Sequence, residues 1–422
     1  DMTIPSIVDC GKRGFVESRH SHCHTMKKQT ASALAFLISA CMSATAADMF
    51  VAPTPLGNEA NPGTREKPRA DVQQVIWGMK PGDTLTLLPG TYTKPFSFAK
   101  SGTVEAPITV RGDASGPAII DGVAQPTSGP EFSMVSVSAN FIRIENLEIR
   151  LSPGWGISVW GKSNVTLRGN KVSGCSQGGI TASFTDLTTV HDVLIENNTL
   201  SDNCRANAEH KTLGGWPASL SIGGTKCLAR GNLVERGHGE GILVGGDQIL
   251  IESNVVRDHF SAGIYLDNAT KCVVRKNFIQ QHSEPPYFIA GEVPGYLTKG
   301  RSISTGIQLA NERPFHGHPN PSADNLIEEN TVVGAKAALY YGEYQRGGGL
   351  KRTRFVRNTF VDGSVELLHL DASAGHADNV FADNHCVQTL ERPVVNSTEI
   401  PAGFSFGNNQ WLGAAPPPSF RK

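Results

Sequence analysis

Short apolar runs recur along this chain, and many of them end at an asparagine. Eight of these asparagines share an apolar residue three positions earlier; they are Asn170, Asn198, Asn232, Asn254, Asn277, Asn330, Asn358 and Asn384. The shortest intervals are 22 residues, from Asn232 to Asn254, and 23 residues, from Asn254 to Asn277. A repeat of this length indicates a solenoid. Two strand-like runs separated by turn residues occupy each repeat, so the predicted unit is a coil of β-strands and not a helical hairpin.

A second apolar run in each repeat is aligned on Gly-Ile or an equivalent pair, as in Gly241-Ile242-Leu243-Val244. Successive side chains of a strand point to opposite faces, so the Ile points inward and the next residue outward. Stacked coils would therefore place one residue per coil in an external row, with neighbours about 4.8 Å apart. The members of this row are Ser158, Thr181, Ser221, Leu243, Tyr265, Gln308 and Tyr340.

This register resembles the right-handed parallel β-helix of the pectate-lyase type over roughly residues 49–412. The resemblance implies an all-β fold: a single right-handed parallel β-helix solenoid with an N-terminal cap helix. In that family, inward asparagines stack at a turn and form hydrogen bonds along the stack. The asparagines therefore belong to the fold and not to a functional site, because a buried amide left without partners costs about 1–3 kcal/mol.

The N-terminal part is similar to the opening of many secreted β-helix enzymes, including chondroitinase-B-like and alginate-lyase-like proteins. The segments that carry this similarity are "FVAPTPLGNEANPGTREKP", from Phe50, and "VIWGMKPGDTLTLLPGTY", from Val75. Within this region Val72 to Met79 predicts a short amphipathic helix that covers the open apolar end. Solenoids need such caps because a terminal coil otherwise exposes its core and its strand edges.

The first residues predict export. Met26-Lys27-Lys28 gives a basic start, an apolar run follows from Ala31 to Ala40, and small residues end at Ala47, as in a secretory signal peptide. Cleavage after Ala46 would release a periplasmic or extracellular protein; lipidation of Cys41 would instead give an outer-membrane lipoprotein. The predicted segments are 1–25, an upstream non-native stretch; 26–47, the signal peptide; 48–130, the cap and first coils; 131–412, the β-helix; and 413–422, a tail.

Charge and cysteine content narrow the class of protein. The 38 Lys and Arg residues nearly balance the 39 Asp and Glu residues, which argues against a nucleic-acid binder. No second long apolar run follows the signal peptide, so we expect no integral membrane span. Five cysteines remain after it, and Cys175 and Cys204 fall at nearly the same turn of adjacent coils, where they could form a disulfide. We expect a monomer.

Three intervals between ladder asparagines exceed the minimal coil: Asn198 to Asn232, Asn277 to Asn330 and Asn330 to Asn358. The first predicts a loop insertion at 204–217, and the second predicts insertions at 283–302 and 311–322. Function on a rigid scaffold concentrates in such loops. His259 and His282 each fall five residues after their asparagine, so we expect them to stack on adjacent coils, with His238 one coil earlier. A lateral groove would then bring these residues close to the external row.

The candidate residues follow from this groove. The catalytic candidates are His238, His259, Tyr265, His282, Lys299 and Arg301. The substrate-binding candidates are His210, Lys211, Trp216, Glu240, Asp267, Tyr340, Tyr344 and Arg346. No cofactor is indicated with certainty. Calcium is the candidate metal, bound by Asp258 and Asp267 with Glu240 nearby, because oxygen donors suit calcium and many pectate-lyase-like sites use it.

The expected partner is a polysaccharide, acidic in the first interpretation. β-Elimination or C5-epimerisation of a uronate needs a base, an acid and a group that neutralises the carboxylate, and His, Tyr, Lys and Arg suit these roles. Hydrolysis would need two facing carboxyls, for which Glu240 with Asp258 or Asp267 could serve. A non-catalytic polysaccharide-binding or matrix protein is the third possibility. Gly237-His238-Gly239 matches the Gly-His-Gly of polygalacturonases, but the companion carboxylate motifs of that family do not occur here.

Overall fold

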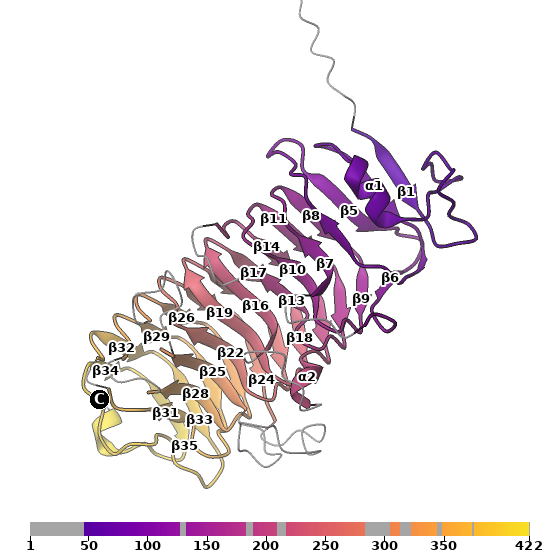
Figure 1. Ribbon diagram of the computed structural model, residues 1–422. Coiled ribbons are helices and arrows are strands. Elements are labelled where there is room, and N and C mark those ends of the chain that lie inside the picture. Colours follow the sequence, from indigo (N-terminus) through magenta and orange to yellow (C-terminus); the bar gives the residue numbers. More distant parts are fainter. Residues whose placement is uncertain are drawn as a thin grey trace, which may run out of the picture. The chain divides into compact units, whose positions relative to one another are not determined.

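The computed structural model describes residues 46–126, 132–182, 189–208, 217–282, 304–312, 322–343, 348–373 and 375–421. In this part of the chain the backbone winds as a right-handed parallel β-helix, passing through three sheets in each turn (Figure 1). We call these sheets A, B and C, in the order in which each coil visits them. Every strand pairs in parallel with the strand one coil before and one coil after, so residues about one repeat apart become neighbours.

The strands of the described residues fall into the three sheets as follows. Sheet A contains β1 (Asp48–Val51), β2 (Thr84–Leu87), β5 (Ile108–Gly112), β8 (Ile142–Glu145), β11 (Val165–Arg168), β14 (Leu194–Glu196), β17 (Leu228–Arg230), β20 (Leu250–Glu252), β23 (Val273–Arg275), β26 (Leu326–Glu328), β29 (Arg354–Val356), β32 (Asn379–Ala382) and β34 (Phe404–Gly407). Sheet B contains β3 (Gly90–Tyr92), β6 (Ala118–Asp121), β9 (Glu148–Arg150), β12 (Lys171–Ser173), β15 (Thr199–Ser201), β18 (Leu233–Glu235), β21 (Val255–Arg257), β24 (Phe278–Gln280), β27 (Thr331–Val333), β30 (Thr359–Val361), β33 (His385–Gln388) and β35 (Gln410–Gly413). Sheet C contains β4 (Phe96–Phe98), β7 (Ser133–Val137), β10 (Trp155–Val159), β13 (Ile180–Ala182), β16 (Ala218–Thr225), β19 (Glu240–Asp247), β22 (Ala262–Asp267), β25 (Thr305–Ala310), β28 (Ala337–Gly342) and β31 (Leu368–Leu370).

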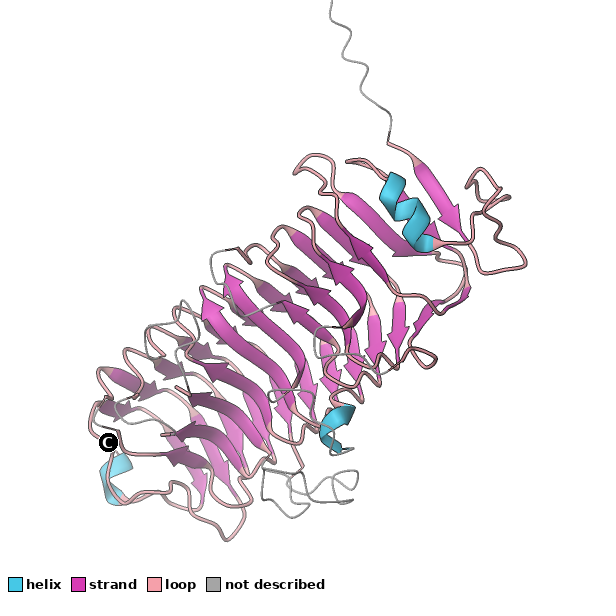
Figure 2. Ribbon diagram, in the orientation of Figure 1, coloured by secondary structure: helices cyan, strands magenta, loops and turns pink. Residues whose placement is uncertain are grey.

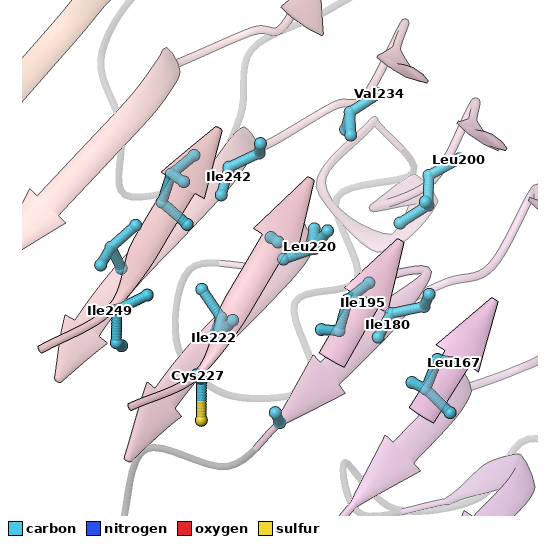
Figure 3. Close-up of a cluster of buried hydrophobic side chains, with 14 of the residues drawn as sticks. Leu167, Ile180, Ile195, Leu200, Leu220, Ile222, Cys227, Val234, Ile242 and Ile249 are labelled. Carbon is cyan, nitrogen blue, oxygen red and sulfur yellow. The ribbon is translucent and has the colours of Figure 1, made fainter. Parts of the chain in front are cut away.

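The core is the interior of the coil, where one side chain per strand stacks on its counterpart in the next coil. Figure 3 shows Ile195 of sheet A, Leu200 of sheet B and Ile222 of sheet C pointing into this interior. All three are fully buried and belong to one continuous apolar cluster. The alternation predicted from the sequence is confirmed, since Ile157 and Ile242 are also fully buried.

The asparagine ladder lies inside the corner between sheets A and B. Asn254 donates from Nδ2 to Asn277 Oδ1 at 3.0 Å and to the Ala229 carbonyl at 3.0 Å. Its own Oδ1 accepts from the backbone N–H and the Nδ2 of Asn232 at 3.0 and 2.9 Å. The pattern holds at the predicted asparagines and extends one coil further, to Asn409. Each amide is thus saturated within the fold, as a structural role requires.

The A–B corner itself is short and uniform. From β8 onward, two residues connect each described sheet A strand to the following sheet B strand. The first of the two adopts a left-handed conformation, as at Lys276 with φ of 55° and Arg357 with φ of 55°, and from β11 onward the second is the ladder asparagine. Such a backbone is unfavourable for residues other than glycine, so the ladder bonds compensate for it.

Helices contribute little to this fold (Figure 2). α1 (Val72–Gly78) forms where a helix was predicted, and the Asp71 side chain accepts the Gln74 N–H at its start. Val72, Val75 and Ile76 pack into the core next to β2 and β4. That this helix serves as a cap stays a prediction. α2 (Arg205–Ala208) follows β15, and the 3-10 helix η2 (Pro418–Phe420) buries Phe420 against Phe406.

Parts of the predicted organisation lie outside the described residues. These are the signal peptide region and most of the three expected insertions. The disulfide suggested by register is not present: Cys175 and Cys204 are both free, fully buried thiols. No helix in the described ranges has the length and apolar content that crossing a membrane requires.

Candidate functional site

The outer face of sheet C carries the predicted external row. Strand pairing aligns Ser158 with Thr181, Thr181 with Ser221, and so on to Tyr340, which confirms the row in full. The row continues one coil further to His369. The side chains of this row differ between the first and the later coils. Its first members carry small hydroxyl side chains, whereas from β19 onward it holds Leu243, Tyr265, Gln308 and Tyr340.

Tyr265 is the centre of this second half. Although it points away from the coil interior, only 4% of its surface is exposed, and it packs in a small apolar cluster with Leu243, Ala262 and Ala310. Its hydroxyl donates to Glu312 Oε1 at 2.8 Å. Burial, followed by the charges of Asp267, Glu312 and Glu240, raises the pKa of Tyr265, so the phenol keeps its proton.

Three carboxyl groups surround this hydroxyl, and we call Glu240, Asp267 and Glu312 the carboxyl cluster. Glu240 begins β19 and pairs with Ala218, which belongs to the same outer cluster as Leu243 and Tyr265, so Glu240 lies on this face. Asp267 ends β22, and Glu312 follows β25. The backbone N–H of Glu312 donates to Asp267 Oδ1 at 3.0 Å. Three successive coils thus supply one carboxyl each.

The electrostatics of the carboxyl cluster favour bound protons. Burial is the main cause that raises the pKa of Glu240 well above its ordinary value, and the charges of Glu312 and Asp267 add to it. Burial likewise raises the pKa of Asp267 to about 7, opposed by the Glu312 N–H and assisted by the Glu312 charge. Glu240 is 5% exposed, and its Oε2 has no hydrogen-bond partner among the residues that the structure describes. A buried oxygen without a partner can accept a proton or a hydrogen bond from a ligand, or donate once protonated.

His259 does not lie in the external groove, which corrects the expected stacking with His282. The ring is 0% exposed and occupies the coil interior, where a Cβ on Gly237 would lie 2.6 Å from its Nδ1. On the next coil Gln281 takes the interior position and accepts the His259 N–H at 2.8 Å. The interior position falls five residues after Asn254 but four residues after Asn277, so the five-residue spacing does not give the same position. A solute outside the coil cannot reach the His259 ring.

His238 and His282 lie at the corner between sheets B and C. His282 is exposed, with Nδ1 at 2.6 Å from Asp258 Oδ1. The backbone of His238 bonds to Asn203 and Asn207. The hydrogen bonds that join Glu312 to Tyr265 and to Asp267 involve neither histidine.

Asp258 and Asp267 cannot bind one calcium ion together. They lie beyond opposite ends of β22, and that strand spans six residues. At about 3.3 Å per residue its ends are roughly 16 Å apart, whereas calcium–oxygen distances are about 2.3–2.6 Å. Within the described ranges no group of three or more His, Cys, Asp or Glu side chains is arranged to hold a metal ion. A calcium requirement stays an untested prediction.

A second polar group lies further along the same face. His369 of β31 stacks on Tyr340 with ring centroids 4.4 Å apart, and its two nitrogens contact Glu366 and Asp371 at 2.6 and 3.0 Å. Burial opposes a charge on this ring, but the two carboxylates outweigh it and raise the pKa of His369. Tyr340 was predicted, whereas His369, Glu366 and Asp371 were missed. The external row continued by one repeat would have found His369.

Several predicted site residues fall outside the described ranges; they are His210, Lys211, Trp216, Lys299, Arg301, Tyr344 and Arg346. Of the described candidates, Tyr265, Glu240 and Asp267 come together. Glu312 completes their cluster and was not predicted. A cavity of about 330 Å³ lies elsewhere, at the N-terminal end between Asp71, Thr91 and Lys94. Asp71 and Lys94 form an ion pair there at 2.9 Å, so the carboxyl cluster is the stronger candidate for chemistry.

Three parallel sheets and an internal asparagine ladder define a right-handed β-helix protein. Residues 155–392 match the family model described as the right-handed beta helix region. The chain belongs to this family. A comparison with the curated proteins finds no match.

Two solved structures show the same fold. One is a GH136 lacto-N-biosidase from Eubacterium ramulus, with a TM-score of 0.58 and 15% sequence identity, covering 87% of this chain and 68% of that chain. The other is pectate lyase Pel9A, with a TM-score of 0.54 and 15% identity, covering 87% of this chain and 81% of that chain. At this identity the likeness concerns the fold alone.

Proposed function

We propose that this protein is an exported glycoside hydrolase that cleaves a neutral glycan on the outer face of sheet C. The observation that carries the proposal is the Glu240 carboxyl, which is buried on an outward face, has an oxygen without a partner, and stands beside Asp267. Glycoside hydrolysis uses two carboxyl groups that hold different protonation states at the same pH. The raised pKa values of Glu240 and Asp267 support such a pair.

Glu240 is the proton donor in this proposal. As the glycosidic bond breaks, its oxygen gains negative charge and needs a proton, and a carboxyl that stays protonated near neutral pH can supply it. Asp267 is the second carboxyl, because a pKa of about 7 lets it lose its proton near neutral pH. In the ionised form it stabilises the positive charge that develops at the anomeric carbon, or attacks that carbon. Tyr265 keeps its proton and orients the group that it contacts.

The carboxyl cluster disfavours the uronate lyase or epimerase first expected from the sequence. An anionic sugar brought beside Glu312 and an ionised Asp267 meets like charge in a buried place, where Coulomb repulsion is strong. The cationic candidates for neutralising a uronate, Lys299 and Arg301, lie outside the described residues. A neutral glycan meets no such repulsion, and its hydroxyl groups can bond to the carboxyl oxygens.

The test is cleavage of a panel of neutral and uronic polysaccharides by the purified protein. Hydrolysis releases reducing ends without ultraviolet absorbance, whereas β-elimination creates a conjugated double bond that absorbs. We expect reducing ends from a neutral glycan, and proton NMR of the first product would show whether the anomeric configuration is retained or inverted. Absorbing products from a uronate would overturn the hydrolase proposal in favour of a lyase. Binding of a glycan without any cleavage would favour the non-catalytic alternative.

A further inference from the structure

Glu312 is held in place by its surroundings. It follows β25, and the residue before it, Asn311, donates from Nδ2 to the Gly349 carbonyl at 2.8 Å. Asn311 Oδ1 accepts the Ser322 N–H at 2.6 Å, so the chain on both sides of residues 313–321 is fixed at one point. Asn311 is buried whereas Glu312 is exposed. The backbone of Glu312 therefore has a defined position even though its side chain reaches solvent.

From this position Glu312 contacts both residues that flank the proposed chemistry. Its Oε1 accepts the Tyr265 hydroxyl at 2.8 Å, and its backbone N–H donates to Asp267 Oδ1 at 3.0 Å. The two bonds use different parts of the residue. A substitution of the side chain can thus remove the negative charge and keep the backbone bond to Asp267.

We propose that Glu312 is a positioning residue which orients Tyr265 and Asp267 for the reaction and holds its negative charge beside them. This inference rests on the proposed hydrolase function, because it gives Glu312 a task in that reaction. Glu312 is then a third carboxyl, and its role differs from those of the proton donor Glu240 and the second carboxyl Asp267.

The charges that face Glu240 come from neighbouring elements. Asp267 and Tyr265 lie on β22, and Glu312 follows β25. The Cys204 thiol lies just before α2, and burial and the Glu240 charge raise its pKa. Glu312 is the largest charged contributor to the raised pKa of Glu240 after burial, and it acts in the same direction on Asp267. A negative neighbour makes ionisation of each carboxyl less favourable. Removing that charge should lower the pH at which both lose their protons.

The experiment compares Glu312→Gln, Glu312→Asp and the wild type. The amide of Gln can still accept from Tyr265, whereas Asp keeps the charge with a shorter side chain. The first readout is the pH profile of kcat/KM on the cleaved glycan. The second is carbon-13 NMR titration of the side-chain carboxyls, with the Asp267 signal assigned by its loss in Asp267→Asn. Glu329→Gln removes an exposed carboxylate of the corner between sheets A and B and is the matched control.

We expect Glu312→Gln to move both limbs of the profile and the Asp267 titration to lower pH by about one unit, while Glu312→Asp and Glu329→Gln stay close to the wild type. An Asp267 titration unchanged in Glu312→Gln, in a protein that melts at the wild-type temperature, would overturn the inference. The NMR readout needs no substrate, so it tests the role of Glu312 even if no glycan is cleaved, and an inactive wild type would count only against the hydrolase.

Discussion

The outer faces of sheets A and C both carry carboxyl side chains, but their surroundings shift the pKa values of these groups in opposite directions. On sheet A, Glu196 lies between Arg168 and Arg230 of the adjacent coils, with the closest contacts at 2.5 and 2.8 Å. Burial works against its charge, but the two arginines outweigh it and lower the pKa of Glu196. On sheet C, Glu240 and Asp267 face Glu312 and each other, and their pKa values are raised.

The difference shows where this scaffold carries chemistry. Carboxylates bridged by arginines hold neighbouring coils together and have no proton to give near neutral pH. Carboxyls crowded against one another store unfavourable electrostatic energy that a rigid fold must hold in place. Four experiments test this difference between the outer faces of sheets A and C.

The largest effect is expected from Glu240→Gln. The amide is close in shape to the carboxyl but cannot donate the required proton, so turnover should fall by about 100- to 10,000-fold. The measurement is kcat on the glycan identified in the screen. Glu252→Gln, which removes a sheet A carboxylate bonded to Arg275, is the control and should leave turnover unchanged. Equal losses in both variants would erase the contrast between the two faces.

The effect of burial away from the carboxyl cluster can be examined at His259. Burial lowers the pKa of this ring to about 4 from an ordinary value of 6.5, opposed by the Val234 backbone and Asp258. Because the unfolded chain binds the proton more tightly, stability is full above pH 6.5 and is lost as pH falls towards 4, by up to about 3 kcal/mol. Urea unfolding at several pH values measures this loss.

His259→Gln is the matched variant, since Gln281 occupies the equivalent interior position one coil later. This variant should fold at pH 7 and show a flatter pH dependence between 6.5 and 4. The same slope in wild type and variant would place the titrating group elsewhere.

The pH profile of the wild type tests the acid pair directly. If Asp267 must be ionised and Glu240 protonated, kcat/KM should fall about tenfold per pH unit below the Asp267 pKa of about 7. The optimum should therefore lie at neutral to alkaline pH. The two limbs report the pair and not either residue alone. An optimum near pH 4 would contradict the proposed protonation states.

The smallest effect is expected from Arg230→Ala on sheet A. About half of the Arg230 side chain is exposed, and Glu196 keeps Arg168 as a partner, so the free energy of unfolding should drop by about 0.2–1 kcal/mol. Thermal and urea unfolding would measure it. A loss of glycan cleavage in this variant, at unchanged stability, would mean that the sheet A face takes part in function after all.

The sequence predicted the coil well because its period constrains every residue. Each ladder asparagine and each member of the external row follows from adding one repeat, so Tyr265 and Tyr340 could be placed on one face without a structure. His259 could not be placed in the same way. Whether its ring points inward depends on the spacing from the ladder asparagine to the interior position, which is five residues at His259 and four at Gln281.

Glu312 could not be predicted from the repeat for a different reason. It follows a strand whose register was clear, yet it stands at the edge of an expected insertion, where repeat arithmetic stops. Only the bonds to Tyr265 and Asp267 identify it. Likewise, no spacing rule could reveal that Glu240 is buried, because an outward position on a solenoid ordinarily means exposure to water.

The two-residue A–B corner has a consequence for how such a gene can change. From β11 onward the corner consists of one left-handed residue and one ladder asparagine. Its length stays constant from β8 onward, so the corner does not accommodate inserted residues. Between β6 and β31, the long intervals between described strands all flank sheet C, before β7, β16 and β25 or after β13, β25 and β28. Duplication and insertion during evolution are thereby directed to the borders of a single sheet. New substrate preferences can arise there, while the A–B corner keeps the same length in each repeat.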